Sequence, residues 1–194
     1  MSDPDGVIGN SRETVSVRTR PEPKPFEGGQ VYHMYPGDYT GKKQEPSFPN
    51  LMAAYYTGWC EADWWNVAPP RVQAGYTILI HAGAYKDDWN SYGSDIWGEE
   101  MGTPFQGTYY LTAKGTPEKP VVIKATGDGD VVFDGDGNFN LFNVTAADYH
   151  YFEGLTIRNT YVAFLAGNKN IIGTVKKCRF EDIDKGIHCD WSGS

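Results

Sequence analysis

Charged residues that could take part in acid–base chemistry recur at matched places in two stretches of the sequence. Arg158 in the first stretch corresponds to Glu181 in the second, and Thr156 corresponds to Arg179, in each case 23 residues later. Cations can neutralise the charge of a substrate, while a histidine such as His150 or a carboxylate such as Glu181 can exchange protons. The same charges also fit a solvated surface ladder, in which each pair contributes about 0.2–1 kcal/mol.

Four aspartates lie among glycines in two short runs and could supply oxygen ligands to Ca²⁺. They are Asp128, Asp130, Asp134 and Asp136. Asp and Asn at alternate positions, with Gly between them, can wrap around this ion. The second run begins like an EF-hand loop, but Phe139 and Thr145 stand where that loop needs Gly and Glu. Asp-Gly pairs also form sharp corners, so the sequence requires no cofactor and points to Ca²⁺ as the ion that it could hold.

Aromatic residues gather in segments that lack a regular pattern, where binding residues concentrate. Trp and Tyr rings present faces that can stack on sugar rings. The candidates for such contacts are Trp64, Trp65, Trp89, Tyr92 and Trp97. Trp64 and Trp65 also fit a second role, in which they pack an N-terminal cap onto the first strands.

A repeat of 23 residues indicates how these side chains are positioned. Leu155–Phe164 aligns without a gap with Cys178–Ile187, and both copies alternate apolar and polar residues before an Asn or Asp. Alternation predicts half-buried strands, and a period in the low twenties that returns a strand to the same place predicts a solenoid. Asn159 and Asp182 then stack at the corner that follows each strand.

Earlier segments continue this pattern. Val131–Asp134 lies 24 residues before Leu155–Arg158, and Leu141–Phe142 lies 23 residues before Phe164–Leu165. Val121–Lys124 is a further predicted strand, and the segments between strands are rich in Gly, Asn and Asp, which tolerate the conformation of sharp corners. We therefore expect an all-β chain that forms a right-handed parallel β-helix of about three to four coils, with apolar ladders facing inward.

Four segments resemble, in the same order, motifs of the pectin-lyase-like right-handed β-helix proteins. These segments are Gly75–Tyr85, Gly115–Ala125, Val131–Gly135 and Phe152–Asn159. The superfamily includes polysaccharide lyases, glycoside hydrolases, sugar epimerases and tailspike proteins. Its lyases use Lys or Arg as the base and often Ca²⁺ to neutralise the substrate, so the resemblance implies such a role for Arg158 or Arg179.

The sequence divides into three parts. We expect a flexible leader at 1–25, an aromatic-rich N-terminal cap at 26–71, and the β-helix at 72–194 with a loop insertion at 86–107. Within the cap, Val31–Pro36 fits a first strand and Leu51–Tyr56 fits a helical turn or two. The chain stops as a new coil begins, which predicts a β-helix truncated at its C-terminus. The exposed Phe180 and Ile187 would then recruit another chain end to end.

Charge and hydropathy narrow the range of partners. The formal net charge of −8 disfavours nucleic acid. No apolar run approaches the roughly 18 residues that span a bilayer, so we expect no membrane partner. Met1–Gly6 shows no signal-peptide pattern. The chain is therefore either cytoplasmic or, as we expect, a secreted or periplasmic protein whose signal has been removed.

The function that these observations favour is a carbohydrate-active β-helix protein, either a lyase or a glycoside hydrolase that acts on a polysaccharide. A hydrolase needs two carboxylates about 5–5.5 Å or about 6.5–9.5 Å apart, and an acidic repeat with rungs about 4.8 Å apart provides many such pairs. Two alternatives stay open: a non-catalytic carbohydrate-binding or structural module, and an inactive fragment of a larger enzyme.

Overall fold

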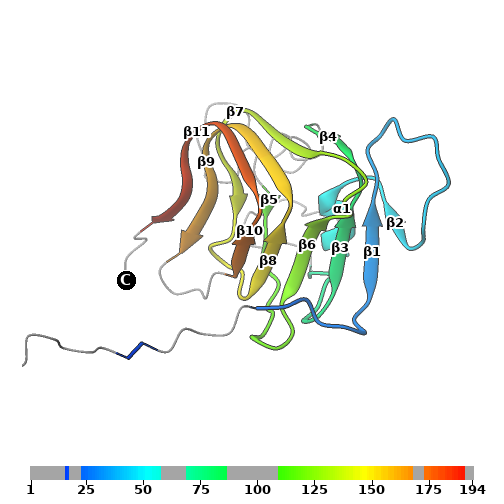
Figure 1. Cartoon of the computed structure of the whole chain (residues 1–194), viewed down its shortest axis with the longest axis horizontal. Coiled ribbons are helices and arrows are strands. Elements are labelled where there is room, and N and C mark those ends of the chain that lie inside the picture. The colour runs from blue at the N-terminus through cyan, green and yellow to red at the C-terminus, as the bar shows by residue number, and fades with distance from the viewer. Residues whose placement is uncertain (1–15, 18–22, 58–68, 87–108, 168–172, 191–194) are drawn as a thin grey trace, which may run out of the picture.

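The computed structural model of the chain describes residues 16–17, 23–57, 69–86, 109–167 and 173–190. These residues are mostly β-strand with little helix, and every pairing between the named strands is parallel. The strands form two sheets (Figure 1). The expected all-β class is therefore confirmed.

The first sheet has six short strands in the order β10-β8-β6-β3-β1-β2. Their bounds are β1 Val31–Met34, β2 Ser47–Phe48, β3 Thr77–Ile80, β6 Val121–Ala125, β8 His150–Glu153 and β10 Thr174–Lys176. Figure 1 shows β1, β3, β6, β8 and β10 side by side in chain order. Each strand after β1 thus lies beside an earlier part of the chain.

The second sheet has the order β11-β9-β7-β4, and β5 also pairs with β7. Its strands are β4 Gly83–Tyr85, β5 Tyr109–Tyr110, β7 Val131–Asn143, β9 Leu155–Gly167 and β11 Arg179–Asp190. The last three are long and curve across the molecule in Figure 1. Their corners carry an open groove.

The register of the long strands matches the predicted spacing at most positions. Leu155 pairs with Val131, 24 residues earlier, and Arg179 pairs with Thr156, 23 residues earlier. The placement of Leu141–Phe142 opposite Phe164–Leu165 is wrong by one residue, because Phe142 pairs with Phe164.

The cause is a register shift in β7 between Asp134 and Asn138. Asp134 pairs with Arg158, but Asn138 pairs with Thr160, so the corner of β7 contains two more residues than the corner of β9. Gly137, inside the corner, has a φ of +82°, a conformation that glycine adopts without steric cost.

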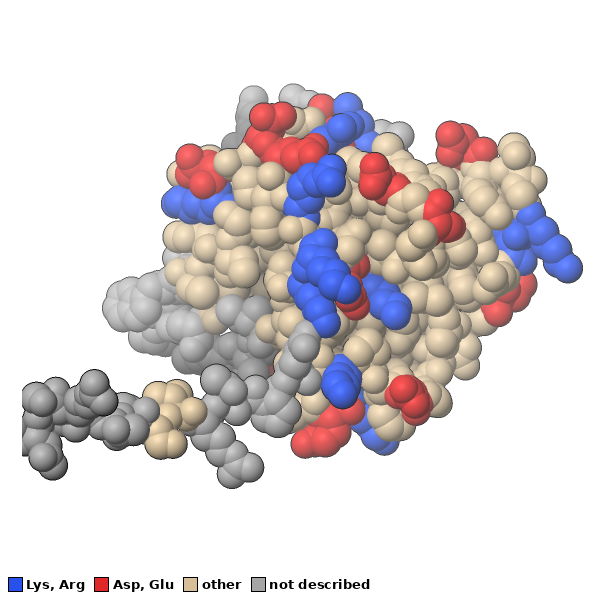
Figure 2. Space-filling model, in the orientation of Figure 1, with Lys and Arg blue, Asp and Glu red and all other residues tan. Residues whose placement is uncertain are grey.

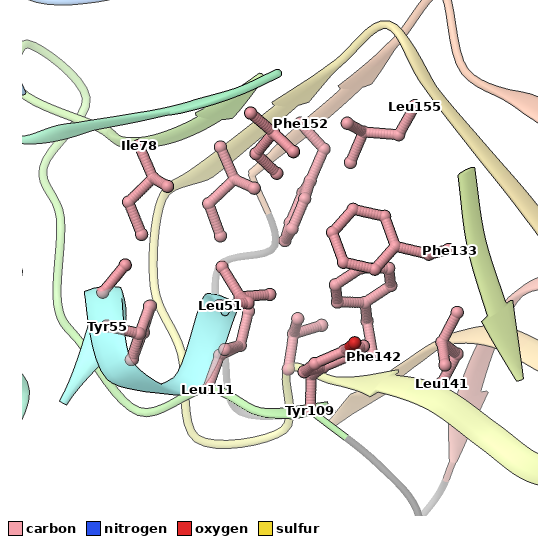
Figure 3. Close-up of a cluster of buried hydrophobic side chains, with 14 of the residues drawn as sticks. Leu51, Tyr55, Ile78, Tyr109, Leu111, Phe133, Leu141, Phe142, Phe152 and Leu155 are labelled. Carbon is pink, nitrogen blue, oxygen red and sulfur yellow. The ribbon is translucent and has the colours of Figure 1, made fainter. Parts of the chain in front are cut away.

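The apolar core lies between the two sheets (Figure 3). Val131 and Phe133 point inward from β7 while Val132 between them is less buried, as alternation predicts. Phe142 packs against Phe133, Phe152 and Phe164 with ring centroids 5.1–5.6 Å apart. Aromatic contacts of this kind each add about 0.5–1.5 kcal/mol beyond the burial of their area.

The segment predicted as an irregular cap is partly regular. It supplies β1, which pairs with β3 over four residues, and the short helix α1, Leu51–Tyr55, which matches the predicted helical turn. Asn50 begins this helix, because its side chain accepts a hydrogen bond of 2.8 Å from the Ala53 amide. In Figure 3, Leu51 and Tyr55 of α1 point toward the core. No helix in the described ranges is long and apolar enough to cross a membrane.

Candidate functional site

An open groove of about 460 Å³ crosses the corners of the three long strands. Its lining comes from β7, β9 and β11: Asp136, Gly137, Asn159, Thr160, Tyr161, Asp182 and Asp184. Neighbouring parallel strands lie about 4.8 Å apart, and the lining residues come from three successive strands of the sheet.

One residue at each corner adopts the left-handed backbone conformation. The φ angles are +50° at Asp136, +52° at Asn159 and +49° at Asp182. Asn and Asp visit this region more readily than other residues with a side chain, which explains their recurrence. The predicted correspondence of Asn159 and Asp182 is confirmed, because the residues on both sides of them pair across β9 and β11.

An exposed aromatic pair borders the groove. The rings of Phe139 and Tyr161 stack with centroids 5.4 Å apart and planes 25° from parallel. The two residues are 59% and 43% exposed, and Lys185 Nζ lies 5.1 Å from the centre of the Tyr161 ring. Stacked rings left in water on an outer surface are suited to a flat apolar ligand face.

Sequence reasoning missed this pair. Its signal lies in the register, because Asn138 pairs with Thr160 and Asn140 pairs with Val162, which brings Phe139 beside Tyr161. The two residues are 22 positions apart, whereas the repeat predicted 23 or 24. A register that allowed for the two extra residues in β7 would have found them.

Arg158 and Asp134 form a tight polar cluster beside the groove. Arg158 Nε donates to Asp134 Oδ2 at 2.9 Å. Asn159 Nδ2 donates to Asp134 Oδ1 at 2.9 Å, and the Asp136 amide donates to the same oxygen at 3.0 Å. Burial alone would raise the pKa of Asp134, but these hydrogen bonds and the charge of Arg158 lower it below the usual range. Asp134 is therefore an ionised carboxylate that holds the corner together.

The predicted ladder pair of Arg158 with Glu181 needs correction. The two residues do pair in register across β9 and β11. However, Arg158 forms its ion pair with Asp134 on the preceding strand. Glu181 instead lies 3.6 Å from Arg179 on its own strand. The partners differ because the side chains of β7 also reach Arg158, a contact that the two-copy alignment did not consider.

His150, a candidate for proton exchange, lies inside the molecule and not on its surface. It is 2% exposed, and its Nε2 lies 2.8 Å from the hydroxyl of Tyr55. Its Nδ1 lies 3.1 Å from the carbonyl of Asp148. Burial lowers the pKa of His150 to about 4, against the opposing effect of Asp148. The neutral ring thus links α1 to β8, away from the residues that line the groove.

Three of the four aspartates predicted to bind Ca²⁺, namely Asp128, Asp134 and Asp136, contact protein partners through their side chains. Asp128 contacts His81, and Asp136 lies 3.0 Å from Lys86 Nζ. Within the described ranges, no three side chains of His, Cys, Asp or Glu are grouped so that they could hold a metal ion. Binding of Ca²⁺ by Asp128, Asp130, Asp134 and Asp136 stays a prediction.

The aromatic residues predicted to contact sugars lie outside the described residues. They are Trp64, Trp65, Trp89, Tyr92 and Trp97. Most of the predicted insertion at 86–107 also lies outside the described residues.

Figure 2 shows that basic side chains gather along the middle of one face, with acidic side chains among and around them. Opposite charges are in contact at Lys177, whose Nζ lies 3.4 Å from the carboxylate of Glu153.

The chain was compared with known protein families, with curated proteins and with solved structures, and none of them matches it.

Proposed function

We propose that the chain is a right-handed parallel β-helix of the pectin-lyase-like kind and that it binds a polysaccharide in the groove across β7, β9 and β11. The parallel pairing of strands 23 and 24 residues apart supports the β-helix. About three to four coils would fit the described strands. A polysaccharide ligand also fits the expected secreted or periplasmic location.

The observation that carries the proposal is the exposed stack of Phe139 on Tyr161 at the edge of a groove lined by hydrogen-bonding groups. A pyranose ring has an apolar face of C–H bonds and a rim of hydroxyls. The Phe139 ring, which stacks on Tyr161 with one face, would offer its other face to the apolar face of the sugar. The carboxylates of Asp182 and Asp184 would accept hydrogen bonds from the hydroxyls, and such charge-assisted bonds are stronger than neutral ones.

The charge of the lining selects among polysaccharides. Asp136, Asp182 and Asp184 line the groove, and the whole chain has a net charge of −8. A polyuronate would bring like charges against these carboxylates. We therefore favour a neutral polysaccharide as the ligand. Lyase chemistry on acidic sugars is the less favoured alternative.

Hydrolysis of the bound polysaccharide is a second candidate function. Asp182 and Asp184 line the same groove two positions apart on β11. Inverting glycosidases use two carboxyl groups about 6.5–9.5 Å apart, and Asp182 and Asp184 place two carboxyl groups at one corner of the groove. One carboxyl group would protonate the leaving oxygen while the other activates a water molecule.

Affinity electrophoresis through gels that contain soluble glucan, xylan, mannan or polygalacturonate tests the proposal. We expect a neutral polysaccharide to retard the chain and Tyr161→Ala to abolish the retardation. Phe26→Ala is the matched control, because Phe26 is also an exposed ring, 37% exposed, with Lys119 Nζ 4.7 Å from its centre. Phe26 does not line the groove.

The outcomes separate the candidate functions. Retardation by polygalacturonate alone, or equal retardation of the wild type and Tyr161→Ala, contradicts binding of a neutral chain in the groove. New reducing ends that disappear in both Asp182→Asn and Asp184→Asn support hydrolysis. Products that absorb as unsaturated uronates would instead support a lyase.

A further inference from the structure

Three titratable side chains form a hydrogen-bonded column along one side of the first sheet. His33 lies on β1, His81 follows β3 directly, and Asp128 lies in the turn between β6 and β7. His33 Nδ1 is 3.1 Å from His81 Nε2, and His81 Nδ1 is 2.6 Å from Asp128 Oδ2. Because β1 pairs with β3 and β3 pairs with β6, the column crosses successive rungs. It is separate from the groove, so its behaviour does not depend on the proposed function.

Asp128 is held as an oriented carboxylate. Its Oδ1 accepts hydrogen bonds from the Ala82 amide at 2.9 Å and from the Thr126 hydroxyl at 2.5 Å. Its other oxygen faces His81. Burial opposes ionisation, but these hydrogen bonds together lower the pKa of Asp128. An ionised carboxylate only accepts hydrogen bonds, so the His81 nitrogen that faces it must carry the proton.

This constraint fixes the tautomers of both rings. With its proton on Nδ1, a neutral His81 has a lone pair on Nε2. The contact of 3.1 Å with His33 then requires His33 Nδ1 to donate the hydrogen bond. The proton of neutral His33 is thus on Nδ1, and its Nε2 carries a lone pair that can accept a proton.

The rings around His81 keep this arrangement in place. Tyr35 stacks on His81 with centroids 4.0 Å apart and planes 9° from parallel, and Tyr39 lies at the edge of the cluster at 6.5 Å. The Tyr85 hydroxyl donates to the His81 carbonyl at 2.7 Å. Lys43 Nζ, the nearby cation, lies 5.6 Å from the centre of the Tyr35 ring.

His33 is 8% exposed, and its surroundings have opposing effects on its pKa. Burial lowers its pKa, and the neighbouring His81 lowers it further, while the charge of Glu45 raises it. Glu45 is itself fixed by hydrogen bonds from the amide and the hydroxyl of Ser47, at 2.7 and 2.9 Å. The two histidines thus lie between two carboxylates, Asp128 and Glu45.

We propose that His33 and His81 act as one unit that takes up a single proton at His33 Nε2 and holds the positive charge on His81, beside Asp128. The proton that arrives at His33 Nε2 comes from water. The proton on His33 Nδ1 moves to His81 Nε2, so His33 ends neutral with its proton on Nε2. His81 becomes an imidazolium whose Nδ1–H still donates to Asp128. One proton enters, and the unit gains one positive charge.

A second proton has a different effect. It would place N–H groups on both nitrogens that now share one hydrogen bond, 3.1 Å apart, and would set two imidazolium ions side by side. The side-chain link between β1 and the end of β3 would then be lost, although the backbone pairing of the two strands remains. The unit therefore acts as a switch that tolerates one proton and breaks its own hydrogen bond at the second.

Long-range ¹H–¹⁵N NMR of the histidine rings, recorded on the full chain, tests this proposal. At pH 8 we expect the proton on Nδ1 in both His33 and His81, assigned with His33→Gln and His81→Gln. As the pH falls, both rings should change together at one midpoint. The second protonation should follow at least about one pH unit lower, as in coupled titrations.

Asp128→Asn sharpens the test. The amide oxygen of the variant must keep accepting from Ala82 and Thr126, so its NH₂ group faces His81 Nδ1. Both histidines should therefore carry their proton on Nε2. Asp130→Asn is the control, because Asp130 is an exposed aspartate of the same turn, and it should leave the tautomers unchanged.

Two outcomes overturn the proposal. One is a wild type in which the two rings titrate independently at ordinary midpoints. The other is a folded Asp128→Asn variant whose tautomers match those of the wild type. The amide spectrum of the variant checks its fold, and if it is unfolded the wild-type titration decides alone.

Discussion

β9 and β11 present matching sequence patterns but experience different surroundings. Ile157 and Phe164 in β9 are 0% and 1% exposed. Their register partners in β11, Phe180 and Ile187, are 37% and 51% exposed. β9 pairs with β7 on one side and β11 on the other, whereas β11 ends its sheet among the described strands. An alternating pattern therefore specifies which way a side chain points, and the neighbouring rungs decide how much of it is buried.

The difference has an energetic consequence. Full burial of an Ile or Phe side chain contributes about 1.5–3 kcal/mol, so equivalent residues of the two strands should contribute unequally. Phe180 makes an edge contact with Phe164 of the core, with the ring centroids 6.3 Å apart. Paired substitutions in β9 and β11 can test this inequality directly.

A charge placed at matched inward positions should give the largest contrast. Ile157→Asp puts an unpaired carboxylate into the core, at a cost that exceeds the few kcal/mol by which domains of this size are stable. We expect it to abolish cooperative unfolding, measured by circular dichroism against urea. Phe180→Asp should unfold cooperatively, because position 180 reaches water. Equal behaviour of the two variants would show that β11 is as well covered as β9.

Removal of a side chain at the second matched pair should give a graded contrast. Phe164→Ala leaves a cavity beside Phe142 and Phe152 and should cost about 3–5 kcal/mol of unfolding free energy. Ile187→Ala, half in water, should cost less than about 1 kcal/mol. Urea titration of both variants measures the two values. A cost for Ile187→Ala close to that for Phe164→Ala would contradict the comparison.

The buried His150 predicts a loss of stability in acid. Its pKa is about 4 in the folded chain and about 6.5 in an unfolded one. Below pH 6.5 the unfolded state binds more protons, so stability falls until the pH reaches about 4, by about 3 kcal/mol. Urea unfolding at pH 7.5 and pH 4 should show a smaller loss for His150→Gln than for the wild type.

His188 serves as the control for this pH effect. It lies on β11, opposite Leu165, and is only half-buried. His188→Gln should retain the wild-type loss of stability in acid. If His150→Gln and the wild type lose the same stability, the burial of His150 is not the cause.

Among the described strands β11 lies at the edge of its sheet, and we expect this edge to affect association more than stability. We propose that Ile187 and this edge bring two copies of the chain together end to end. Ile187→Lys adds a charge there and should shift the sedimentation coefficient at high concentration toward the monomer. A monomeric wild type at the same concentration would contradict this association.

The sequence predicted the strands and their parallel pairing, because the alternation and the spacing that indicate them are local patterns. Alternation located the starts of β9 and β11 to within one residue, but both strands continue three residues beyond the predicted copies, to Gly167 and Asp190. Parallel pairing followed from the spacing of the copies. The burial of His150 could not be predicted in this way, because its partner Tyr55 lies 95 residues away in the chain.

The candidate site was less predictable than the fold. The acidic repeat offered many carboxylate pairs, but the Phe139–Tyr161 stack depends on two extra residues at the corner of β7. Such a bulge changes which residues meet without changing the alternation that surrounds it. The site thus arises where the repeat is irregular, and a strict period cannot find it.

Amide chemical-shift mapping tests the central claim most directly. The ¹⁵N-labelled chain is titrated with hexasaccharides of β-1,4-linked glucose, xylose or mannose. We predict that one of them shifts the amides of residues 136–139, 159–161 and 182–184 together, with a common dissociation constant, and that Tyr161→Ala removes these shifts. Shifts confined to other parts of the chain, or none with any of the three sugars, would contradict a neutral-polysaccharide groove across β7, β9 and β11.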